Sequence, residues 1–369
     1  MRLLVAGGGT GGHLFPGIAL ADEVTRRGGG EVLFVGTDRG IETRAVPAAG
    51  YALETLKVSG LVRMGLWGTV RGLFRIPLAL LRSFAILRKF RPDVVVGVGG
   101  YASGPMVLAA AMAGYPTAIQ EQNSVPGITN RVLGRMVRAV FTAFDEAAKY
   151  FPARKIARLG NPARKAIVAA LEEAQGSDGE KVASSDRKVR ILVVGGSQGA
   201  RAVNELVVGT APILAKQGVD FTLVHQAGKA DAERMQARYR ELGLDGRVEV
   251  RPFIDNMAAA YGAADLVIAR AGALTLAELA IVGKPAILIP LPTAADDHQS
   301  KNAAHFERAG AAVVLSQRTS SAQDLASAVA TLASDPRKRA AMGKAMRALA
   351  QPQAAQAIMD RLQTLARRQ

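Results

Sequence analysis

Short apolar stretches rich in Val, Leu and Ile recur along the chain and alternate with segments long enough to form helices. Each stretch is continuously apolar, which is typical of parallel strands that are buried on both faces of a sheet. The pattern therefore predicts an α/β protein with open, doubly wound parallel sheets. The stretches are RLLVAG, EVLFVG, DVVVGVGG, TAIQEQN, VRILVVGG, FTLVHQAG, VEVRPF, ADLVIAR and PAILIPLP.

Two of these stretches open in the same way. Residues 2–13 and 190–201 each contain a basic residue, an apolar strand and a glycine-rich turn that leads toward a helix. Two such openings, half a chain apart, predict two Rossmann-like domains. We place the first domain at residues 1–160 and the second at 161–339, and we expect a C-terminal helix over about 340–369 to pack back on the first.

One uncharged stretch, residues 94–120, has the length of a transmembrane helix. Seven glycine and proline residues interrupt it, so we predict a strand at 93–97, a helix at 105–113 and a strand at 117–120 instead. The polar stretch 172–188 is expected to be an exposed connection or insertion, and it suggests no role.

The composition indicates a globular protein with an anionic partner. Of the 369 residues, 49% are apolar and 21% are charged, and the formal net charge is +16. Such a charge favours nucleic acid, acidic lipid headgroups or phosphorylated ligands. Aromatic residues make up only 5% and no nucleic-acid-binding motif is present, so nucleic acid is not expected. The chain has no cysteine, which excludes disulfides and thiolate chemistry and fits a cytoplasmic setting.

Four glycine-rich turns follow predicted strands. Ligands of open parallel sheets lie beyond the carboxyl ends of the strands, where glycine allows close approach of the backbone and a helix start offers N–H groups. A single turn of this kind is as often a plain connection, whereas four of them favour phosphate binding. The turns are residues 7–12, 97–104, 195–199 and 269–278.

The first turn has two further features. Gly7, Gly9 and Gly12 match the dinucleotide-binding spacing G-x-G-x-x-G, which is weak evidence by itself, and Asp38 follows the second strand too late to be a persuasive ribose ligand. His13 lies where the helix begins, which makes it a candidate general base or, alternatively, a capping or packing residue.

Several longer blocks occur in a distinctive order. They are GGGTGGHLFPGIALADE, GVGGYASGPMVLAA, EQNSVPGITNR, GNPAR, GGSQGARAVNE, PFIDNMAAAY, ARAGALTLAEL and DDHQSKNAAHFERAGAA. Together they resemble the MurG family of N-acetylglucosaminyltransferases, from the N-terminus to about Ala312. The resemblance implies a GT-B fold, in which two Rossmann-like domains face each other across a cleft. It also implies inverting transfer of GlcNAc from UDP-GlcNAc to the 4-hydroxyl of MurNAc in lipid I (undecaprenyl-pyrophosphoryl-MurNAc-pentapeptide), which gives lipid II and UDP without a metal or other cofactor.

The resemblance also assigns roles to residues. Ile254 would meet uracil through its backbone, Glu278 would accept hydrogen bonds from the ribose, and Gln299 would contact GlcNAc. The acceptor diphosphate loops would contain Gly9, Gly100, Tyr101, Ser103 and Gly104. The full UDP-GlcNAc site would consist of Thr10, Gly11, Gly12, Asn123, Arg164, Ser197, Ile254, Ala273, Leu274, Thr275, Leu276, Ala277, Glu278 and Gln299.

His13 is the preferred base for the acceptor hydroxyl, with Glu121 or a water-mediated base as alternatives. The adjacent Asp296 and Asp297 are interpreted as a loop rather than a metal site. One position departs from the family pattern, because Ala271 stands where a serine is expected. If that hydroxyl helps to hold the phosphate loop in relatives, the affinity for the donor is lower here.

Residues 57–91 contain eight Lys or Arg and no acidic residue, interleaved with large apolar side chains. This pattern favours peripheral binding to an anionic membrane surface, and an ordinary amphipathic crossover helix is the alternative. The resemblance implies a place at the cytoplasmic face of the bacterial membrane, and cell-wall synthesis and division proteins as partners. The membrane patch would contain Leu66, Trp67, Arg71, Leu73, Phe74 and Arg75.

Three other functions compete with the transferase. They are another UDP-sugar enzyme of the same fold (a glycolipid transferase or an epimerase), an NAD(P) oxidoreductase that uses the first glycine turn, and a basic membrane adaptor without catalysis.

Overall fold

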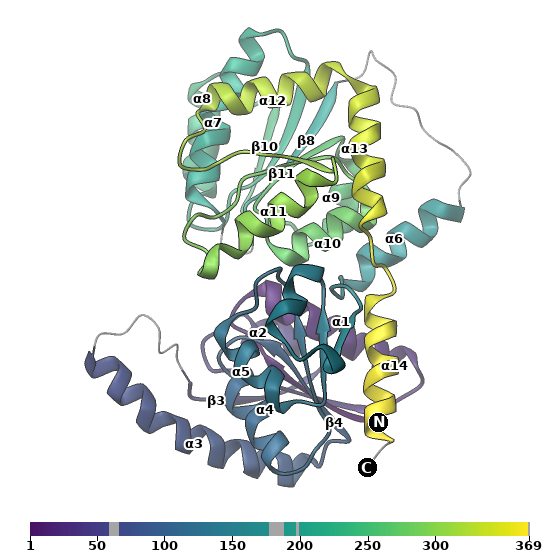
Figure 1. Ribbon diagram of the computed structural model, residues 1–369. Coiled ribbons are helices and arrows are strands. Elements are labelled where there is room, and N and C mark those ends of the chain that lie inside the picture. Colours follow the sequence, from purple (N-terminus) through teal and green to yellow (C-terminus); the bar gives the residue numbers. More distant parts are fainter. Residues whose placement is uncertain (59–65, 177–187, 197–198, 368–369) are drawn as a thin grey trace. The chain divides into compact units, whose positions relative to one another are not determined.

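The computed structural model describes residues 1–58, 66–176, 188–196 and 199–367, with the side chains of 66–76 and 173–176 excepted. The chain divides into two compact units (Figure 1). Unit 1 consists of Met1–Lys165 and Gln351–Gln369, and unit 2 of Ala166–Ala350.

Unit 1 contains a sheet of seven parallel strands in the order β3-β2-β1-β4-β5-β6-β7. Its strands are β1 (Arg2–Gly7), β2 (Glu31–Thr37), β3 (Ala52–Leu56), β4 (Val94–Gly99), β5 (Thr117–Glu121), β6 (Ala139–Thr142) and β7 (Ile156–Arg158). Its α-helices are α1 (Gly11–Arg26), α2 (Glu42–Ala48), α3 (Leu66–Phe90), α4 (Ser103–Met112), α5 (Ile128–Met136) and α14 (Ala354–Ala366), with short 3-10 turns at Asp145–Tyr150 and Ala153–Lys155.

Strand β1 shows why its sequence is continuously apolar. Leu3 and Val5 pack into the core on the face covered by α1 and α14, whereas Leu4 and Ala6 pack into the core on the face covered by α3, α4 and α5. Burial stabilises the fold by about 1.5–3 kcal/mol for each fully buried side chain of this size. A strand with two buried faces therefore has no position at which a polar residue would be favoured.

Unit 2 contains six parallel strands in the order β10-β9-β8-β11-β12-β13. The strands are β8 (Val189–Val194), β9 (Phe221–Gln226), β10 (Val248–Arg251), β11 (Leu266–Ala269), β12 (Ala286–Leu288) and β13 (Ala312–Val314). The helices are α6 (Lys165–Gly176), which starts at the unit boundary, α7 (Arg201–Lys216), α8 (Ala232–Glu241), α9 (Met257–Ala263), α10 (Ala273–Val282), α11 (His298–Arg308), α12 (Ala322–Ser334) and α13 (Pro336–Ala348), with a 3-10 turn at Ala295–Asp297. The predicted fold class, two doubly wound parallel α/β units, is confirmed.

The uncharged stretch at 94–120 folds as β4, α4 and β5, as its glycines and prolines predicted. A search of the helices in the described part of the chain finds none that is long and apolar enough to cross a membrane.

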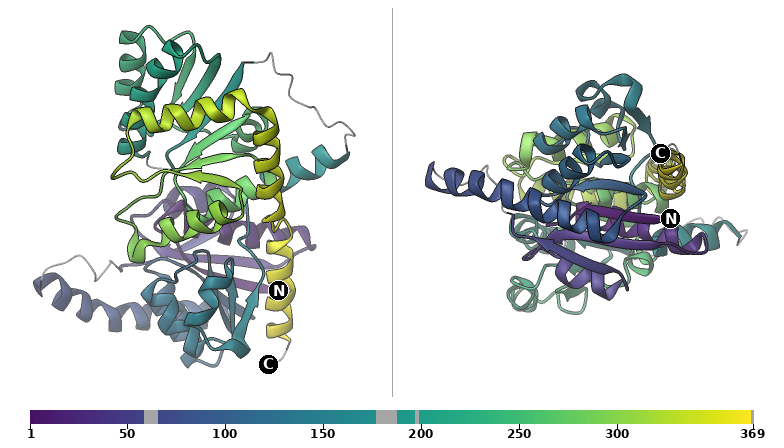
Figure 2. Two further views of the ribbon diagram at one scale, coloured as in Figure 1. Left: turned by 45° about the horizontal axis from the view of Figure 1, so that its top comes forward. Right: turned by 90° about the horizontal axis from the view of Figure 1, so that it is seen from below.

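The end of the chain forms two helices rather than one. α13 belongs to unit 2, and α14 belongs to unit 1, where Ile358 and Leu362 pack into the same core as Leu20 of α1. Arg27, just after α1, donates to Asp360 Oδ1 at 2.7 Å and to the carbonyl of Gln356 at 3.0 Å. The two ends of the chain consequently lie close together in unit 1 (Figures 1 and 2).

Candidate active site

The four predicted glycine turns lie at one particular place in each sheet. In unit 1 they follow β1 and β4, which are neighbours although their helices, α1 and α4, cover opposite faces. In unit 2 they follow the corresponding neighbours β8 and β11. Adjacent parallel strands whose chains leave in opposite directions form the crevice in which doubly wound sheets bind ligands. Each unit therefore has one candidate site, at the carboxyl end of its two central strands.

The two turns of unit 1 are in backbone contact. The N–H of Gly8 donates to the carbonyl of Gly99 at 3.2 Å. A Cβ at Gly100 would lie 2.3 Å from the Gly8 oxygen, and a Cβ at Gly7 would lie 2.4 Å from the Gly99 oxygen. Since Gly7, Gly99 and Gly100 also have positive φ values, only glycine allows the two turns to pack in this way.

Helix α1 begins without a capping side chain or an acidic residue in its first turn. The N–H groups of Gly11 and Gly12 form no hydrogen bond with any described residue. His13 lies in this first turn, where Nδ1 is 3.2 Å from Thr10 Oγ1 and the ring contacts Gly99, whose Cβ would lie 2.7 Å from Cδ2. The structure thus brings the predicted base and two open N–H donors to the same helix start.

Gly9, in contrast, has its N–H already engaged. It donates to Oε2 of Glu42 at 2.7 Å. A dinucleotide pyrophosphate at G-x-G-x-x-G needs the backbone of this turn, so the buried carboxylate opposes the oxidoreductase interpretation. Any anion at the first turn must use the N–H groups that follow Gly9.

The other residues expected at the acceptor loops differ in accessibility. Tyr101 is 59% exposed, whereas Ser103 is fully buried and its Oγ has no hydrogen-bond partner among the described residues. Gly104 is half-buried beside Thr129 of α5, whose Cγ2 would lie 3.4 Å from an added Cβ. Tyr101 is therefore the exposed one of these three residues, and its contact with a ligand stays a prediction.

Glu121, the alternative base, is enclosed. Oε1 accepts hydrogen bonds from the N–H of Asn123 at 3.0 Å, and Oε2 accepts one from Asn130 Nδ2 at 2.8 Å. Burial raises the pKa of this carboxyl against those hydrogen bonds, and only 2% of the residue is exposed. The arrangement suits a residue that holds the loop bearing Asn123, not one that takes a proton from a substrate.

Arg164 belongs to unit 1, and its guanidinium carbon lies 5.4 Å from the centre of the Phe15 ring of α1. This cation–π contact places a cation beside the start of α1. Ser197, a further residue of the expected donor site, lies outside the described residues.

In unit 2 the start of α10 is open in the same way as that of α1. It has no capping side chain and no acidic residue in the first turn, and the N–H groups of Ala273, Leu274 and Thr275 form no hydrogen bond with any described residue. Three such groups at a helix N-terminus make an anion-binding arrangement. Leu276 is buried behind them, and Ala277 is half-buried.

Arg270 and Asn302 hold the turn that leads to α10. Arg270 donates to the carbonyl oxygens of Ile289 and Pro290 at 2.9 and 3.2 Å, and burial lowers its pKa. Asn302 donates to the carbonyl of Ala271 at 3.3 Å. Ala271 itself is fully buried, so a serine hydroxyl at this position would lie inside the turn.

Ile254 combines burial with open backbone groups. It is 2% exposed, and neither its N–H nor its carbonyl forms a hydrogen bond with a described residue. Unpaired backbone groups at a buried residue are rare. One donor and one acceptor side by side are what recognition of a pyrimidine edge requires.

Glu278 and Gln299 complete the expected set in unit 2. Glu278 is 1% exposed, and the hydroxyl of Tyr261 donates to it at 3.5 Å. Gln299 Oε1 accepts from the N–H of Leu291 at 3.0 Å, which leaves its amide nitrogen as the group that can donate to a ligand. Asp296 and Asp297 adopt left-handed φ values of 51° and 54° and turn the chain into α11. Among the described residues, no cluster of three or more His, Asp or Glu side chains could hold a metal ion.

The residues that sequence reasoning missed are those that hold the turns. Glu42, Gln122, Asn130, Arg270 and Asn302 fix the loops through their side chains, mostly by bonds to backbone atoms. Gln122, Asn130, Arg270 and Asn302 lie inside motifs quoted for the family resemblance, but nothing in those motifs indicated that their side chains hold the turns. Glu42 lies in no such motif, and only its place shortly after the second strand could have drawn attention to it.

The membrane patch is only partly described. The backbone of α3 includes Leu66, Trp67, Arg71, Leu73, Phe74 and Arg75, but their side chains lie outside the described part. Further along α3, Leu78 and Leu81 are 65% and 67% exposed.

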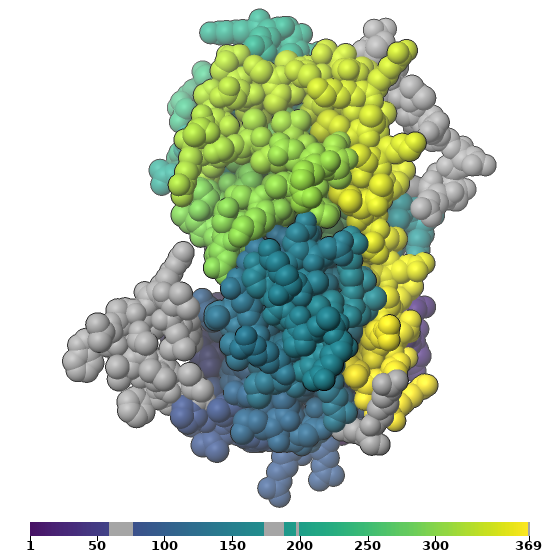
Figure 3. All heavy atoms as spheres, viewed as in Figure 1, coloured from purple at the N-terminus to yellow at the C-terminus, as the bar shows by residue number. Residues whose placement is uncertain are grey.

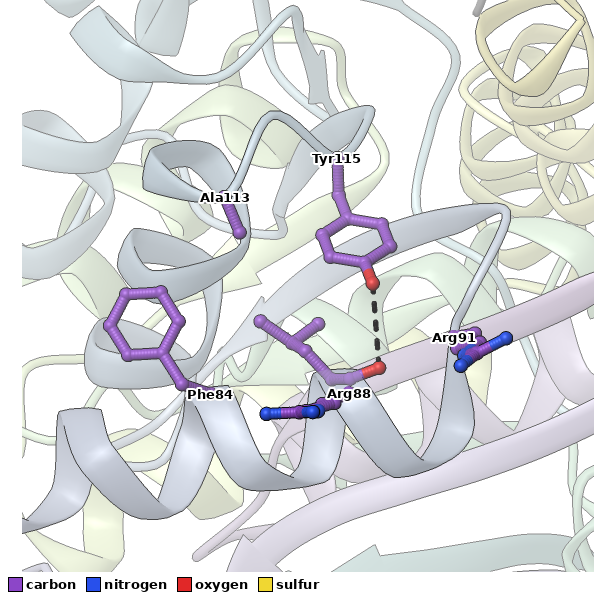
Figure 4. A pocket seen from close by; sticks show the side chains of 6 residues that line it. Phe84, Arg88, Arg91, Ala113 and Tyr115 are labelled. Carbon is purple, nitrogen blue, oxygen red and sulfur yellow. Dashed lines mark hydrogen bonds between the residues drawn. The ribbon is translucent and has the colours of Figure 1, made fainter.

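A cavity of about 380 Å³ lies between the carboxyl-terminal ends of α3 and α4 (Figure 4). It is lined by Phe84, Leu87, Arg88, Arg91, Ala113 and Tyr115. Arg91 precedes β4 and Tyr115 precedes β5, so the cavity lies at the amino-terminal edge of the sheet. It does not belong to the candidate site, which lies at the opposite edge.

Both units thus place glycine turns and an open helix start at the central strands of a doubly wound parallel sheet, an arrangement typical of α/β proteins that bind phosphorylated ligands. Residues 3–142 match the glycosyltransferase family 28 N-terminal domain, and residues 190–361 match its C-terminal domain. The chain belongs to glycosyltransferase family 28 and, within it, to the family of UDP-N-acetylglucosamine–N-acetylmuramyl-(pentapeptide) pyrophosphoryl-undecaprenol N-acetylglucosamine transferases.

The relatives that show this membership match over almost their whole length. The transferase of that name from Anaeromyxobacter dehalogenans (strain 2CP-1) is 49% identical over 369 residues, which cover 100% of this chain and 94% of the relative. The one from Myxococcus xanthus is 48% identical over 361 residues, 98% of this chain and 92% of the relative. The crystal structure of Acinetobacter baumannii MurG is 33% identical, with a TM-score of 0.78, and covers 98% of this chain and 99% of that one.

Proposed function

We propose that this protein transfers GlcNAc from UDP-GlcNAc to the 4-hydroxyl of MurNAc in undecaprenyl-pyrophosphoryl-MurNAc-pentapeptide, and so performs the reaction for which its relatives are named. In this reaction the acceptor oxygen bonds to the anomeric carbon, the bond from that carbon to the diphosphate breaks, and UDP leaves with the electron pair. One base must take the proton of the hydroxyl, and fixed donors must stabilise the charge that develops on the diphosphate.

Unit 2 is proposed to bind the donor. The observation that carries this proposal is the open start of α10, where Ala273, Leu274 and Thr275 offer three N–H groups at the central crevice of the sheet. Arg270 adds a cation next to this turn. Helix N–H groups and a guanidinium together can stabilise a diphosphate leaving group without a metal ion.

The rest of UDP-GlcNAc fits groups that surround this crevice in unit 2. The backbone N–H and carbonyl of Ile254 would pair with uracil, since both are without a described partner. Gln299 would donate to a sugar hydroxyl from its amide nitrogen, since its oxygen is occupied by Leu291. Glu278 is proposed to accept hydrogen bonds from the ribose, which requires its buried carboxylate to become accessible when the donor binds.

Unit 1 is proposed to bind the acceptor and to supply the base. The N–H groups of Gly11 and Gly12 would meet a diphosphate at the start of α1, with Tyr101 beside them on the second turn. In the tautomer with the proton on Nδ1, the Nδ1–H of His13 donates a hydrogen bond to Thr10 Oγ1. The lone pair of the ring then lies on Nε2. Nε2 is then the atom that would take the proton of the acceptor hydroxyl.

We also propose that the protein acts at the surface of the bacterial cell membrane, on its cytoplasmic face. Support comes from an apolar and basic surface over three neighbouring helices of unit 1, of which α4 and α5 reach the surface in the blue to teal region of Figure 3. Its exposed apolar residues are Leu78 and Leu81 on α3, Met112 on α4, and Ile128, Val132 and Met136 on α5. Exposed cations on the same helices include Arg88 and Arg135, whereas Arg82 is paired with Glu54 at 2.9 Å. Apolar side chains at this density would enter the acyl boundary while the cations meet anionic headgroups.

Binding to vesicles tests the location. Vesicles with anionic lipid should retain the protein, and salt should weaken the binding. The triple variant with Trp67, Leu73 and Phe74 changed to Ser, and the double variant with Leu78 and Leu81 changed to Ser, should bind less. Binding equal to that of the unmodified protein in both variants would contradict the membrane proposal.

Release of UDP with a short-chain lipid I analogue tests the reaction. UDP-GlcNAc should support turnover, whereas UDP-GalNAc should support little, and no metal ion should be required. Thermal stabilisation by UDP but not by NAD would separate this function from the oxidoreductase alternative. Stabilisation by NAD alone would overturn the proposal.

A further inference from the structure

Glu42, the first residue of α2, is the only acidic side chain seen to bond the backbone of the first glycine turn in the described part of the chain. It is fully buried. Oε2 accepts a hydrogen bond from the N–H of Gly9 at 2.7 Å, and Oε1 accepts two from Thr37, at 2.8 Å from N–H and 2.7 Å from Oγ1. The carboxylate thereby ties the end of β2 to the turn that follows β1.

The surroundings of this carboxylate are built from glycine. A Cβ at Gly8, Gly36 or Gly40 would lie 2.5, 2.6 or 2.0 Å from the nearest atom of the Glu42 side chain. Gly8 has a positive φ, but Gly36 and Gly40 do not, so at those two positions it is space rather than backbone conformation that requires glycine. Three absent side chains leave a niche that the glutamate fills.

A carboxylate is the group that fits these contacts. It accepts hydrogen bonds at both oxygens, and all three contacts come from donors. Burial by itself raises the pKa of Glu42, but the hydrogen bonds from Gly9 and Thr37 outweigh burial and hold the pKa below its usual range. A glutamine would turn an NH₂ group toward one of these donors and leave that donor unsatisfied.

The turn that Glu42 ties down leads directly to the groups proposed for chemistry. Thr10, the residue after Gly9, forms a hydrogen bond between its Oγ1 and Nδ1 of His13. Gly11 and Gly12 follow it and present the open N–H groups. A displacement of about 1 Å of a catalytic group can lower a rate on the order of 100-fold. The negative charge of Glu42 lies close to a site that is proposed to bind an anion, and it would repel that anion. Its presence there is therefore explained by the positioning of the turn rather than by attraction of the substrate.

We infer that Glu42 is a positioning residue of the transferase, which sets the first glycine turn and, through it, the Thr10–His13 pair and the N–H donors of α1. The inference rests on the proposed function for its effect on turnover, and on the contacts of Glu42 alone for its effect on the turn.

The test compares Glu42→Gln with Glu23→Gln. Glu23 is also buried, lies in the last turns of α1 far along the chain from the glycine turn, and pairs with Arg26 and Arg27. Both variants lose a bonded, buried carboxylate. We expect Glu42→Gln to lower kcat about 10- to 100-fold when the rate is divided by the concentration of protein that binds UDP. The Kd for UDP should be nearly unchanged. We expect Glu23→Gln to lower the melting temperature and leave kcat per UDP-binding site unchanged.

Gly40→Ala supplies a second variant that keeps the charge, in case Glu42→Gln does not fold. Its methyl group displaces the carboxylate, so kcat should fall in the same direction, and the double variant should lose less than the product of the two single losses. Amide hydrogen exchange over residues 7–13 should accelerate in both variants but not in Glu23→Gln, whatever reaction the protein catalyses. If the unmodified protein transfers no GlcNAc but this exchange pattern holds, the proposed function fails while the positioning of the turn stands. Unchanged kcat and unchanged exchange in Glu42→Gln would overturn the inference.

Discussion

Helices α12 and α13 begin differently from α1 and α10. At α12, Ser321 Oγ accepts the N–H of Asp324 at 3.3 Å while the Asp324 carboxylate accepts the N–H of Ser321 at 2.7 Å, and at α13 Asp335 accepts the N–H of Lys338 at 2.8 Å. Helices α1 and α10 have no such cap. A cap stabilises a helix by roughly 1 kcal/mol, so the two open starts leave that contribution unused.

The missing cap is informative only together with its location. Helix α5 also begins without a capping side chain, and it follows no central strand. At α1 and α10 the open N–H groups coincide with glycine turns at the point where neighbouring strands send their helices to opposite faces. Under the proposed function, the capped starts contribute to stability and the open starts to binding.

His13→Ala should produce the largest effect, since it removes the proposed base from the open start of α1. We expect kcat to fall on the order of 100- to 10,000-fold. The KM for UDP-GlcNAc should change far less, because the donor contacts are proposed to lie mainly in unit 2. Steady-state kinetics with a short-chain lipid I analogue measures both. Turnover equal to that of the unmodified protein would remove His13 as the base.

Acid should weaken a buried hydrogen-bonded cluster at the first turn of α7, a helix that also begins without a capping side chain. Asn204 in its first turn contacts His225, which is fully buried and also meets the hydroxyl of Tyr239 at 2.9 Å. Burial lowers the pKa of His225 to about 4. Because the unfolded chain binds a proton at His225 more readily than the folded protein does, acid favours unfolding. The contribution of the neutral, buried His225 to the unfolding free energy, about 3 kcal/mol, is fully present above pH ~6.5, the usual histidine pKa, and is lost as the pH falls toward about 4.

Urea unfolding between pH 7 and pH 4.5 measures this loss. His225→Gln should be less stable at pH 7 and should show a shallower decline of the unfolding free energy with falling pH. Tyr239→Phe, which keeps the titrating ring, should be less stable but decline as the unmodified protein does. Parallel declines in all three proteins would show that His225 does not titrate on unfolding.

Gly272→Asp would convert the open start of α10 into a capped one. The N-cap Gly272 has extended backbone angles, and its added Cβ would meet nothing closer than Thr275 Oγ1 at 3.9 Å. The new carboxylate would occupy the N–H groups and repel the diphosphate. We expect UDP affinity, measured by calorimetry, to fall about tenfold or more, with an equal or higher melting temperature. Gly272→Ser, an uncharged cap, should weaken binding less, and full UDP affinity in the aspartate variant would refute the α10 site.

Ser321→Ala makes the reverse change at α12 and should have the smallest effect. Loss of the cap should lower the unfolding free energy by about 1 kcal/mol. UDP affinity and turnover should stay as they are, because Ser321 belongs to no proposed site. Chemical unfolding together with the UDP-release assay checks both parts, and a loss of UDP affinity here would break the distinction between the two kinds of helix start.

The sequence by itself determined the fold class and the four turns. The continuous apolar runs could only be strands with two buried faces, as Leu3 and Leu4 of β1 show by packing into different cores. Glycine at Gly7, Gly99 and Gly100 was visible as a pattern, because the need for positive φ is local. The donor contacts expected at Ala273, Leu274 and Thr275 came from the family resemblance, and they stay a prediction.

Only the tertiary structure decided which groups around those turns are open and which are occupied. Gly9 was expected to face a diphosphate, yet its N–H is bonded to Glu42 from another helix. Glu121 was a candidate base, yet Asn123 and Asn130 enclose it. Ile254 is buried, and its backbone N–H and carbonyl have no hydrogen-bond partner among the described residues. The residue type gives no indication of this in the sequence. Hydrogen bonds between segments that are distant in sequence depend on how the whole chain folds. The local pattern of residue types does not encode which distant segments come together.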